Sequence, residues 1–144
     1  MGKVKGSYIL LIELATNKDI FVGKLGNVYF PKSTYAYVGS AMNGLGARLA
    51  RHLRRGKKLH WHIDYLLKEA EVDEIILCQG DNRVECSLAQ ALSIGFQCIP
   101  DFGSSDCKCR SHLYFASEKG RLKARVAEAV KQAGLAYEIF PKGV

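Results

Sequence analysis

The sequence lacks the features that would place it in a membrane or divide it into separate parts. Its 144 residues include no run of about 18 apolar residues, the length that a membrane helix needs. It contains no linker, no low-complexity tract and no internal repeat. The N-terminal lysines precede a short apolar run, as in a signal peptide, but Glu13 interrupts that run and no small-residue cleavage site follows. We therefore expect one domain, residues 1–144, that works in solution.

Acidic residues are fewer than basic ones, and the number of cysteines is odd. The chain has 14 Asp and Glu against 21 Lys and Arg, which gives a formal net charge of +7 at pH 7. This charge favours a polyanionic partner, although many basic proteins bind no nucleic acid. The 5 cysteines have no secretory context, which indicates reduced thiols rather than a disulfide framework. The composition therefore predicts a cytoplasmic protein.

Apolar runs and turn signals predict a small α+β domain. The strands that we expect cover residues 6–14, 35–40, 72–78, 112–115 and 137–140. The helices that we expect cover residues 43–55, 60–70, 80–95 and 118–133. Turn signals around residues 20–30 add an extra N-terminal hairpin. Because strands and helices do not alternate in a regular βαβ order, we expect a small mixed or antiparallel central sheet flanked by helices.

The helix expected at residues 43–55 combines an apolar stripe with many cations. Leu45, Leu49 and Leu53 recur every four residues and predict the buried face. Arg48 and His52 are also four residues apart, so they share a neighbouring face. The pattern therefore predicts one arginine and one histidine beside the core.

Residues 43–57 contain no acidic side chain, which is unusual for a solvated helix. Neighbouring like charges cost roughly 0.2–0.5 kcal/mol per pair, and a nearby anion would relieve that cost. The candidate nucleic-acid-binding residues are Arg51, Arg54, Arg55, Lys57, Lys58 and His60. His62, on the other side of Trp61 from His60, is a further candidate for DNA contact or proton transfer. A solvated basic face without a partner is the alternative interpretation.

Glu85 has two interpretations. It follows Asn82 by three residues, so it could complete a capping arrangement at a helix N-terminus. It also lies beside the apolar stripe of Val84, Leu88 and Leu92, which would hold it rigidly near the sheet. One carboxylate, together with waters and a substrate phosphate, commonly holds Mg²⁺. The residue is therefore a candidate metal ligand as well as a candidate cap.

Cys107, Cys109 and His112 form a C-x-C-x₂-H cluster, while Cys86 and Cys98 lie elsewhere in the sequence. Tetrahedral zinc usually binds cysteines in C-x₂₋₄-C spacing, and a C-x-C pair suits it less well. The spacing favours structural or free thiols, with a zinc site or a disulfide as the alternatives.

The order of these elements resembles the GIY-YIG nuclease superfamily. "GSY" (residues 6–8) resembles its first motif and "YVG" (residues 37–39) its second. "GARLARHL" (residues 46–53) resembles the helix with the family's arginine, and "VECSLAQAL" (residues 84–92) the helix with its metal-binding glutamate. The segment "DFGSSDCKCRSHLYF" resembles a compact branch of poorly assigned role, whose members are sometimes fused to endonuclease III-type repair glycosylases.

The resemblance implies a role for each matching residue. Tyr8 would be the general base, directly or through water, and Tyr37 would orient the attacking water or the phosphate, while Arg48 would stabilise charge at phosphorus. For the two tyrosines, core aromatics with satisfied hydroxyls are the alternative interpretation. Glu85 would hold Mg²⁺ or Mn²⁺, and His52 is close enough in sequence to join the site. The implied function is a metal-dependent endonuclease that hydrolyses DNA in repair or recombination, with DNA and a DNA-repair protein as expected partners. A non-catalytic nucleic-acid-binding module is the alternative.

The chain departs from the superfamily pattern at three points. Ser7 stands where isoleucine is usual in the first motif. The connection between the two motif tyrosines is longer than usual, and the hairpin at residues 20–30 fills it. No asparagine follows Asn82, so Ser111 or His112 are the candidates for the late asparagine of many relatives.

Overall fold

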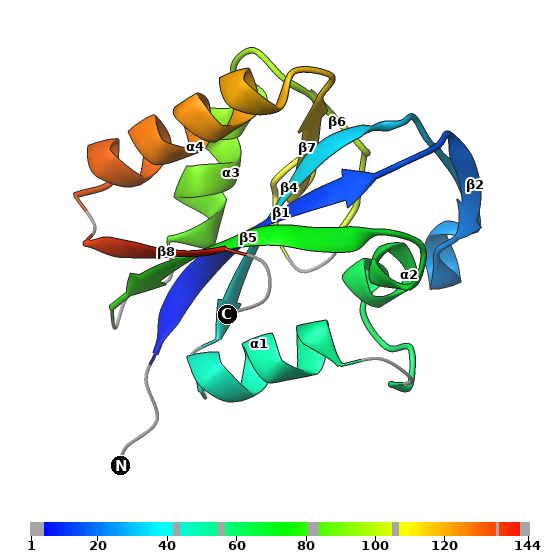
Figure 1. Cartoon of the computed structure of the whole chain (residues 1–144), viewed down its shortest axis with the longest axis horizontal. Coiled ribbons are helices and arrows are strands. Elements are labelled where there is room, and N and C mark those ends of the chain that lie inside the picture. Colours follow the sequence, from blue (N-terminus) through cyan, green and yellow to red (C-terminus); the bar gives the residue numbers. More distant parts are fainter. Residues whose placement is uncertain are drawn as a thin grey trace.

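Six strands form one antiparallel sheet in the order β6-β7-β4-β1-β5-β8 (Figure 1). The computed structural model describes residues 5–41, 44–54, 57–80, 84–104, 107–134 and 136–141. The strands of the sheet are β1 (Gly6–Leu14), β4 (Ser33–Ala41), β5 (Glu71–Gln79), β6 (Gln97–Cys98), β7 (Leu113–Ala116) and β8 (Tyr137–Pro141). A separate hairpin consists of β2 (Lys18–Phe21) and β3 (Asn27–Phe30). The helices are α1 (Leu45–Leu53), α2 (His62–Glu69), α3 (Glu85–Ser93) and α4 (Lys119–Gln132).

β1 lies inside the sheet, and its apolar run is buried on both faces. β4 and β5 flank it in antiparallel pairing. Successive side chains of a strand point to opposite faces. Tyr8 and Leu10 therefore enter one core, whereas Ile9 and Leu11 enter the other. A shift of one residue in the pairing would exchange the two sets, so the pattern fixes the register.

Helices cover both faces of the sheet, which gives three layers (Figure 1). α1 and α2 pack on the face of Tyr8 and Leu10, where Leu45 and Leu66 are buried. α3 and α4 pack on the opposite face, which places Leu88 in the second core. The strand centre thus carries side chains for two separate helical layers.

The predicted fold class is confirmed: the chain is α+β, with an antiparallel central sheet flanked by helices and an additional N-terminal hairpin. The strand predicted at residues 6–14 coincides with β1. α2 begins at His62, two residues later than predicted, and the two-residue strand β6 was not predicted. Asn43 and Arg55, the predicted ends of the first helix, lie outside the described residues.

Candidate functional site

Tyr8 occupies a position that only a glycine on the neighbouring strand allows. Tyr8 of β1 pairs with Gly39 of β4. A Cβ atom at Gly39 would lie 2.5 Å from Cζ and the hydroxyl oxygen of Tyr8. The tyrosine ring therefore lies across the bare backbone of Gly39. The glycine of the "YVG" motif has a steric reason in this fold.

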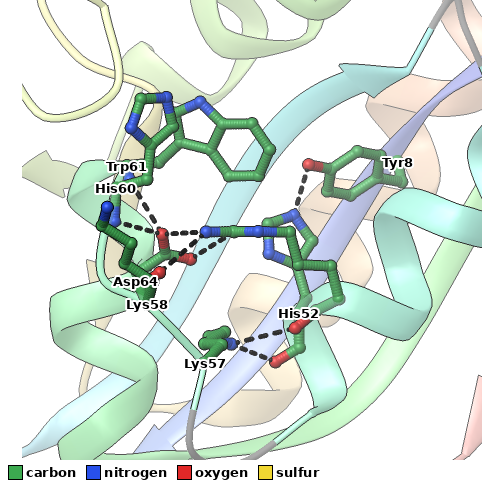
Figure 2. Close-up of polar contacts among 8 residues, drawn as sticks. Tyr8, His52, Lys57, Lys58, His60, Trp61 and Asp64 are labelled. Carbon is green, nitrogen blue, oxygen red and sulfur yellow. Dashed lines mark hydrogen bonds and ion pairs between the residues drawn. The ribbon is translucent and has the colours of Figure 1, made fainter.

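The Tyr8 hydroxyl and Nε2 of His52 share a hydrogen bond of 2.6 Å (Figure 2). His52 is only 3% exposed, so it occupies the third position of the buried α1 stripe after Leu45 and Leu49. The prediction that Leu53 completes the stripe was wrong, because Leu53 is 50% exposed. Both Leu53 and His52 fit helical spacing, and the hydrogen bond with Tyr8 offsets the cost of burying the imidazole.

His52 is a neutral imidazole at neutral pH. Burial, with the nearby positive charge of Lys57, lowers its pKa from 6.5 to about 4. Its Nδ1 atom is buried and has no hydrogen-bond partner among the described residues. Burial likewise raises the pKa of Tyr8 to about 12, against the opposing charge of Arg48. The resting pair is therefore uncharged.

Arg48 stands beside this pair without a carboxylate partner among the described residues. Its Nη1 donates a hydrogen bond of 3.1 Å to the carbonyl oxygen of Ser40, at the end of β4. Its guanidinium carbon lies 4.3 Å from the ring centroid of Trp61, a cation–π contact. These contacts fix the guanidinium near Tyr8 while leaving its charge unpaired by any described acid.

Tyr37 lies next to Tyr8 on the same face of the sheet. Their ring centroids are 6.4 Å apart. Burial raises the pKa of Tyr37 well above 10, and the charges of Tyr8 and Glu85 add to this effect. Gly103 packs against the ring, since a Cβ there would lie 3.0 Å from Cε1 of Tyr37.

Glu85 is the first residue of α3, and its Oε2 lies 4.0 Å from Nδ1 of His112. The negative charge of Glu85 contributes to the raised pKa of both Tyr8 and Tyr37. Val84 N–H donates a hydrogen bond of 3.4 Å to the Ser7 hydroxyl, which ties the start of α3 to β1. Glu85 does not have the predicted capping role, because the N-cap of α3 is Val84 and no side-chain capping bond is present there. Asn82, the predicted cap, lies outside the described residues.

Arg51 is paired with a carboxylate of its own chain, that of Asp64. Its Nη1 and Nη2 donate hydrogen bonds of 2.8 Å to the two carboxylate oxygens of Asp64. Asp64 also accepts backbone hydrogen bonds from His60 and Trp61, and these contacts hold its pKa below the usual value even though burial opposes them. At Arg51, a carboxylate on α2 therefore relieves the repulsion between the neighbouring positive charges of residues 43–57.

The other predicted nucleic-acid-binding residues have different surroundings. Lys57 Nζ donates to the carbonyl oxygens of Arg51 and His52, at 3.2 and 2.6 Å, and so caps the end of α1. Arg54 and Lys58 are exposed, and His60 is exposed with its ring 5.4 Å from that of Trp61. Arg55 lies outside the described residues.

A cavity of about 480 Å³ opens between the end of α1, α2 and the start of β5. Arg54, Lys57 and Lys68 are among its lining residues, together with apolar side chains such as Leu67. His52 also lines it. The imidazole that bonds Tyr8 therefore forms part of the wall of this cavity, which the carboxylates of Asp64 and Glu71 also line.

The structure brings Cys86 into the cluster that the sequence left incomplete. Ligand atoms of Cys86, Cys107, Cys109 and His112 all lie within 4.8 Å of one another, and this group could hold a metal ion. Cys86 follows Glu85 on the first turn of α3. Sequence spacing could not find it, because 26 positions separate it from His112. Cys98 lies in β6 and is not part of the group.

The two candidates for a late asparagine have other partners. The Ser111 hydroxyl accepts a bond of 2.9 Å from Leu113 N–H and donates one of 3.1 Å to the Leu113 carbonyl. The His112 ring belongs to the cysteine cluster. His62, the further sequence candidate, accepts a hydrogen bond of 2.9 Å from Gly103 N–H at Nδ1.

Fold and site together define a small α+β protein with a buried tyrosine–histidine pair flanked by an arginine and a glutamate. The chain matches the family described as "Domain of unknown function DUF123" over residues 7–135, and it belongs to that family. Comparisons with curated proteins and with solved structures find no match. Within the described part of the chain, every helix is too short or too polar to cross a membrane.

Proposed function

We propose that this protein is a divalent-metal-dependent endonuclease of the GIY-YIG kind, acting on DNA in repair or recombination. The observation that carries the proposal is the convergence of Tyr8, Arg48, His52 and Glu85. The Tyr8 hydroxyl bonds His52 directly, and the charges of Arg48 and Glu85 both act on it. A base, a cation and a carboxylate around one point are the groups that phosphodiester hydrolysis needs.

The Tyr8–His52 pair would activate the attacking water. With its proton on Nδ1, His52 accepts the Tyr8 hydroxyl proton at Nε2 while Tyr8 takes a proton from the water. The water oxygen then forms a bond to phosphorus as the bond to the leaving oxygen breaks. Burial keeps Tyr8 and His52 neutral before the reaction. The proton of the attacking water would therefore be removed during the reaction and not beforehand.

Arg48 would stabilise the negative charge that develops on the phosphate, and Glu85 would hold a divalent cation that shares this role. Arg48 has no described carboxylate to compete with a phosphate, and a guanidinium can contact two phosphate oxygens at once. Glu85 makes no ion pair with a described Lys or Arg, so its carboxylate suits a hard cation. A Mg²⁺ or Mn²⁺ ion held by Glu85 would supply positive charge that stabilises the leaving oxygen.

The expected partner is DNA, bound along the end of α1. Arg54 and Lys58 are exposed cations close to Arg48 in the chain, whereas Arg51 already pairs with Asp64. Charge reversal of Arg54 and Lys58 should weaken DNA binding and lower the slope of log affinity against log salt, by about 0.9 for each phosphate that is no longer neutralised. Lys131→Glu on α4, in the layer on the opposite face of the sheet, is the control; an equal effect there would place DNA elsewhere.

The test of cleavage compares wild type with Glu85→Gln and Arg48→Ala. Both changes should reduce Mn²⁺-dependent nicking of branched or duplex DNA by orders of magnitude, with thermal stability and DNA binding nearly retained. Glu128→Gln, an exposed carboxylate on α4, should retain full activity.

The second candidate is a non-catalytic DNA-binding module, which the burial of Tyr8 favours because its side chain is only 1% exposed. Wild-type protein that binds DNA but nicks no substrate in Mg²⁺ or Mn²⁺ would establish this alternative. Cleavage that Glu85→Gln leaves unchanged would remove Glu85 from the mechanism.

A further inference from the structure

We propose that Cys86, Cys107, Cys109 and His112 bind one zinc ion, which joins the segment between β6 and β7 to the first turn of α3. Zinc binding at this site can be measured apart from cleavage, because it needs neither DNA nor an active nuclease. The proposal rests on the spacing of the four ligand atoms, the orientation of His112 and the structure of the segment that carries three of the ligands.

The ligand atoms are already close to tetrahedral spacing. Zn–S bonds of about 2.3 Å and Zn–N bonds of about 2.0 Å place tetrahedral ligand atoms about 3.5–3.8 Å apart. Nε2 of His112 lies 3.4 Å from Sγ of Cys107 and 3.9 Å from Sγ of Cys86. Since no pair in the group exceeds 4.8 Å, side-chain adjustments of about 1 Å would complete the coordination.

His112 is oriented as a metal-bound histidine is. Its Nε2 faces the sulfurs, while its Nδ1 lies 4.0 Å from Oε2 of Glu85. Metal-ligating histidines commonly direct the second ring nitrogen to a carboxylate, which fixes the ring and its tautomer. His112 is only 3% exposed, so its ring nitrogens face protein groups rather than bulk water.

The described part of the segment between β6 and β7 is partly buried but lacks regular secondary structure. Phe102, Ser104 and Ser111 are buried, yet the described residues of the segment form neither helix nor strand. Backbone bonds of 2.7–2.8 Å, from Asp101 to Arg110 and from His112 to Phe102, close its base. At the other end, Cys107 and Cys109 bring the segment to α3, whose N-cap lacks a side-chain bond. A zinc ion would cross-link this end of the segment to the first turn of α3.

The donor set selects zinc over the cation proposed for Glu85. Three thiolates and one imidazole match a structural Cys₃His zinc site, whereas Mg²⁺ and Mn²⁺ prefer oxygen ligands. Binding converts three thiols to thiolates and releases three protons, and the site then carries a net charge of about −1 with a neutral imidazole. A disulfide would engage only two of the three sulfurs and would not explain the facing imidazole.

The zinc site would also position part of the proposed active site, an inference that rests on the proposed function. Cys86 is the next residue after Glu85, so fixing Cys86 fixes the carboxylate on the first turn of α3. The same segment places Gly103 against the ring of Tyr37, and the Gly103 N–H donates a hydrogen bond to His62. One metal-bound segment would thus fix the positions of both Glu85 and Tyr37.

The experiment measures metal in the reduced full-length chain without DNA. Protein purified in the presence of Zn²⁺ should contain one zinc per chain, as measured by inductively coupled plasma mass spectrometry. Replacement by Co²⁺ should give the visible absorption of tetrahedral cobalt with sulfur-to-cobalt charge transfer. Cys86→Ser and Cys109→Ser should lose the zinc or bind it at least tenfold more weakly, while Cys98→Ser, a control outside the cluster, should retain it.

Three outcomes would overturn the site. They are wild-type protein that binds no Zn²⁺ or Co²⁺ on titration, Cys86→Ser that binds as tightly as Cys98→Ser, and an intact mass two hydrogens lighter that shows a native disulfide. If the serine variants do not fold, the titration of wild type with Co²⁺ still decides. Failure of nuclease activity in protein with a full complement of zinc would refute the proposed function and leave the zinc site standing.

Discussion

The hydroxyl of Tyr8 and Nε2 of His52 lie 2.6 Å apart, although 44 positions separate the residues in the chain. The contact joins the central strand of the sheet to the buried side of α1. It is a polar bond inside an apolar core, because both side chains are almost fully buried. The pair therefore contributes to stability as well as to the chemistry proposed for it.

A double-mutant cycle on Tyr8→Phe and His52→Leu should show coupling between the two residues. Each single change leaves a buried polar group without its partner, at a cost of about 1–3 kcal/mol, whereas the double change removes both groups. The free energies of unfolding, measured in urea, should give a coupling energy of about 1–2 kcal/mol. Additive losses would mean that the hydrogen bond contributes nothing to stability.

The stability of the protein should fall as the pH decreases from about 6.5 to about 4. The unfolded chain binds a proton at His52 near pH 6.5, whereas in the folded protein the pKa is lowered to about 4. The unfolded state therefore binds more protons in this window, and unfolding becomes easier as the pH falls. The contribution that is lost is about 3 kcal/mol at most. Unfolding of His52→Leu should depend less on pH between these values, and an identical dependence would exclude His52 as the cause.

Breaking the pair of Arg51 and Asp64 should destabilise the protein strongly. Asp64 is fully buried, and Asp64→Asn leaves the Arg51 guanidinium with half of its bidentate contact. We expect a loss of about 3 kcal/mol, at the lower end for buried pairs because Arg51 is partly exposed. Glu69→Gln, which breaks the exposed pair with Lys18, is the matched control and should cost less than about 1 kcal/mol. Equal midpoints of urea unfolding for the two variants would contradict this difference.

Gly39→Ala should displace Tyr8 from His52. The new methyl group would meet the far end of the Tyr8 ring, which can rotate away more easily than backbone can move. We therefore expect a moderate loss of stability, of about 1–3 kcal/mol, together with loss of the coupling between Tyr8 and His52. The double-mutant cycle repeated in the Gly39→Ala background measures this directly. Gly46→Ala on α1, where an added Cβ meets nothing within 4 Å, should leave the coupling intact.

Local patterns in the sequence were sufficient for the fold class. The apolar run at residues 6–14 is long and lacks turn residues, so it predicted the strand that became β1 with the same bounds. The helical stripe of α1 was predicted only in part, because spacing alone allowed either Leu53 or His52 at its end. His52 is buried because it forms a hydrogen bond with Tyr8 on β1, and helical periodicity carries no information about that contact.

Contacts between distant segments explain what the sequence could not provide. The anion beside Arg51 is Asp64, which lies on the next helix and outside the run of positive residues. Cys86 joins Cys107 and Cys109 only because α3 begins near the segment that precedes β7. Both relationships are set by how the helices pack against the sheet. Residue types and spacing within one segment carry no information about them.

The unequal lengths of β4 and β7 have a consequence for self-association. β4 continues to Ala41, but its pairing with β7 ends at Tyr37, with one further bond from Val38 to the His112 carbonyl. Backbone groups that extend beyond a partner strand are a template for pairing with another chain. Arg48 occupies this edge by donating to the Ser40 carbonyl, and its charge opposes the approach of a second cationic copy. The guanidinium proposed to stabilise the phosphate thus also occupies a backbone carbonyl of β4 that a strand of a second molecule would need for pairing.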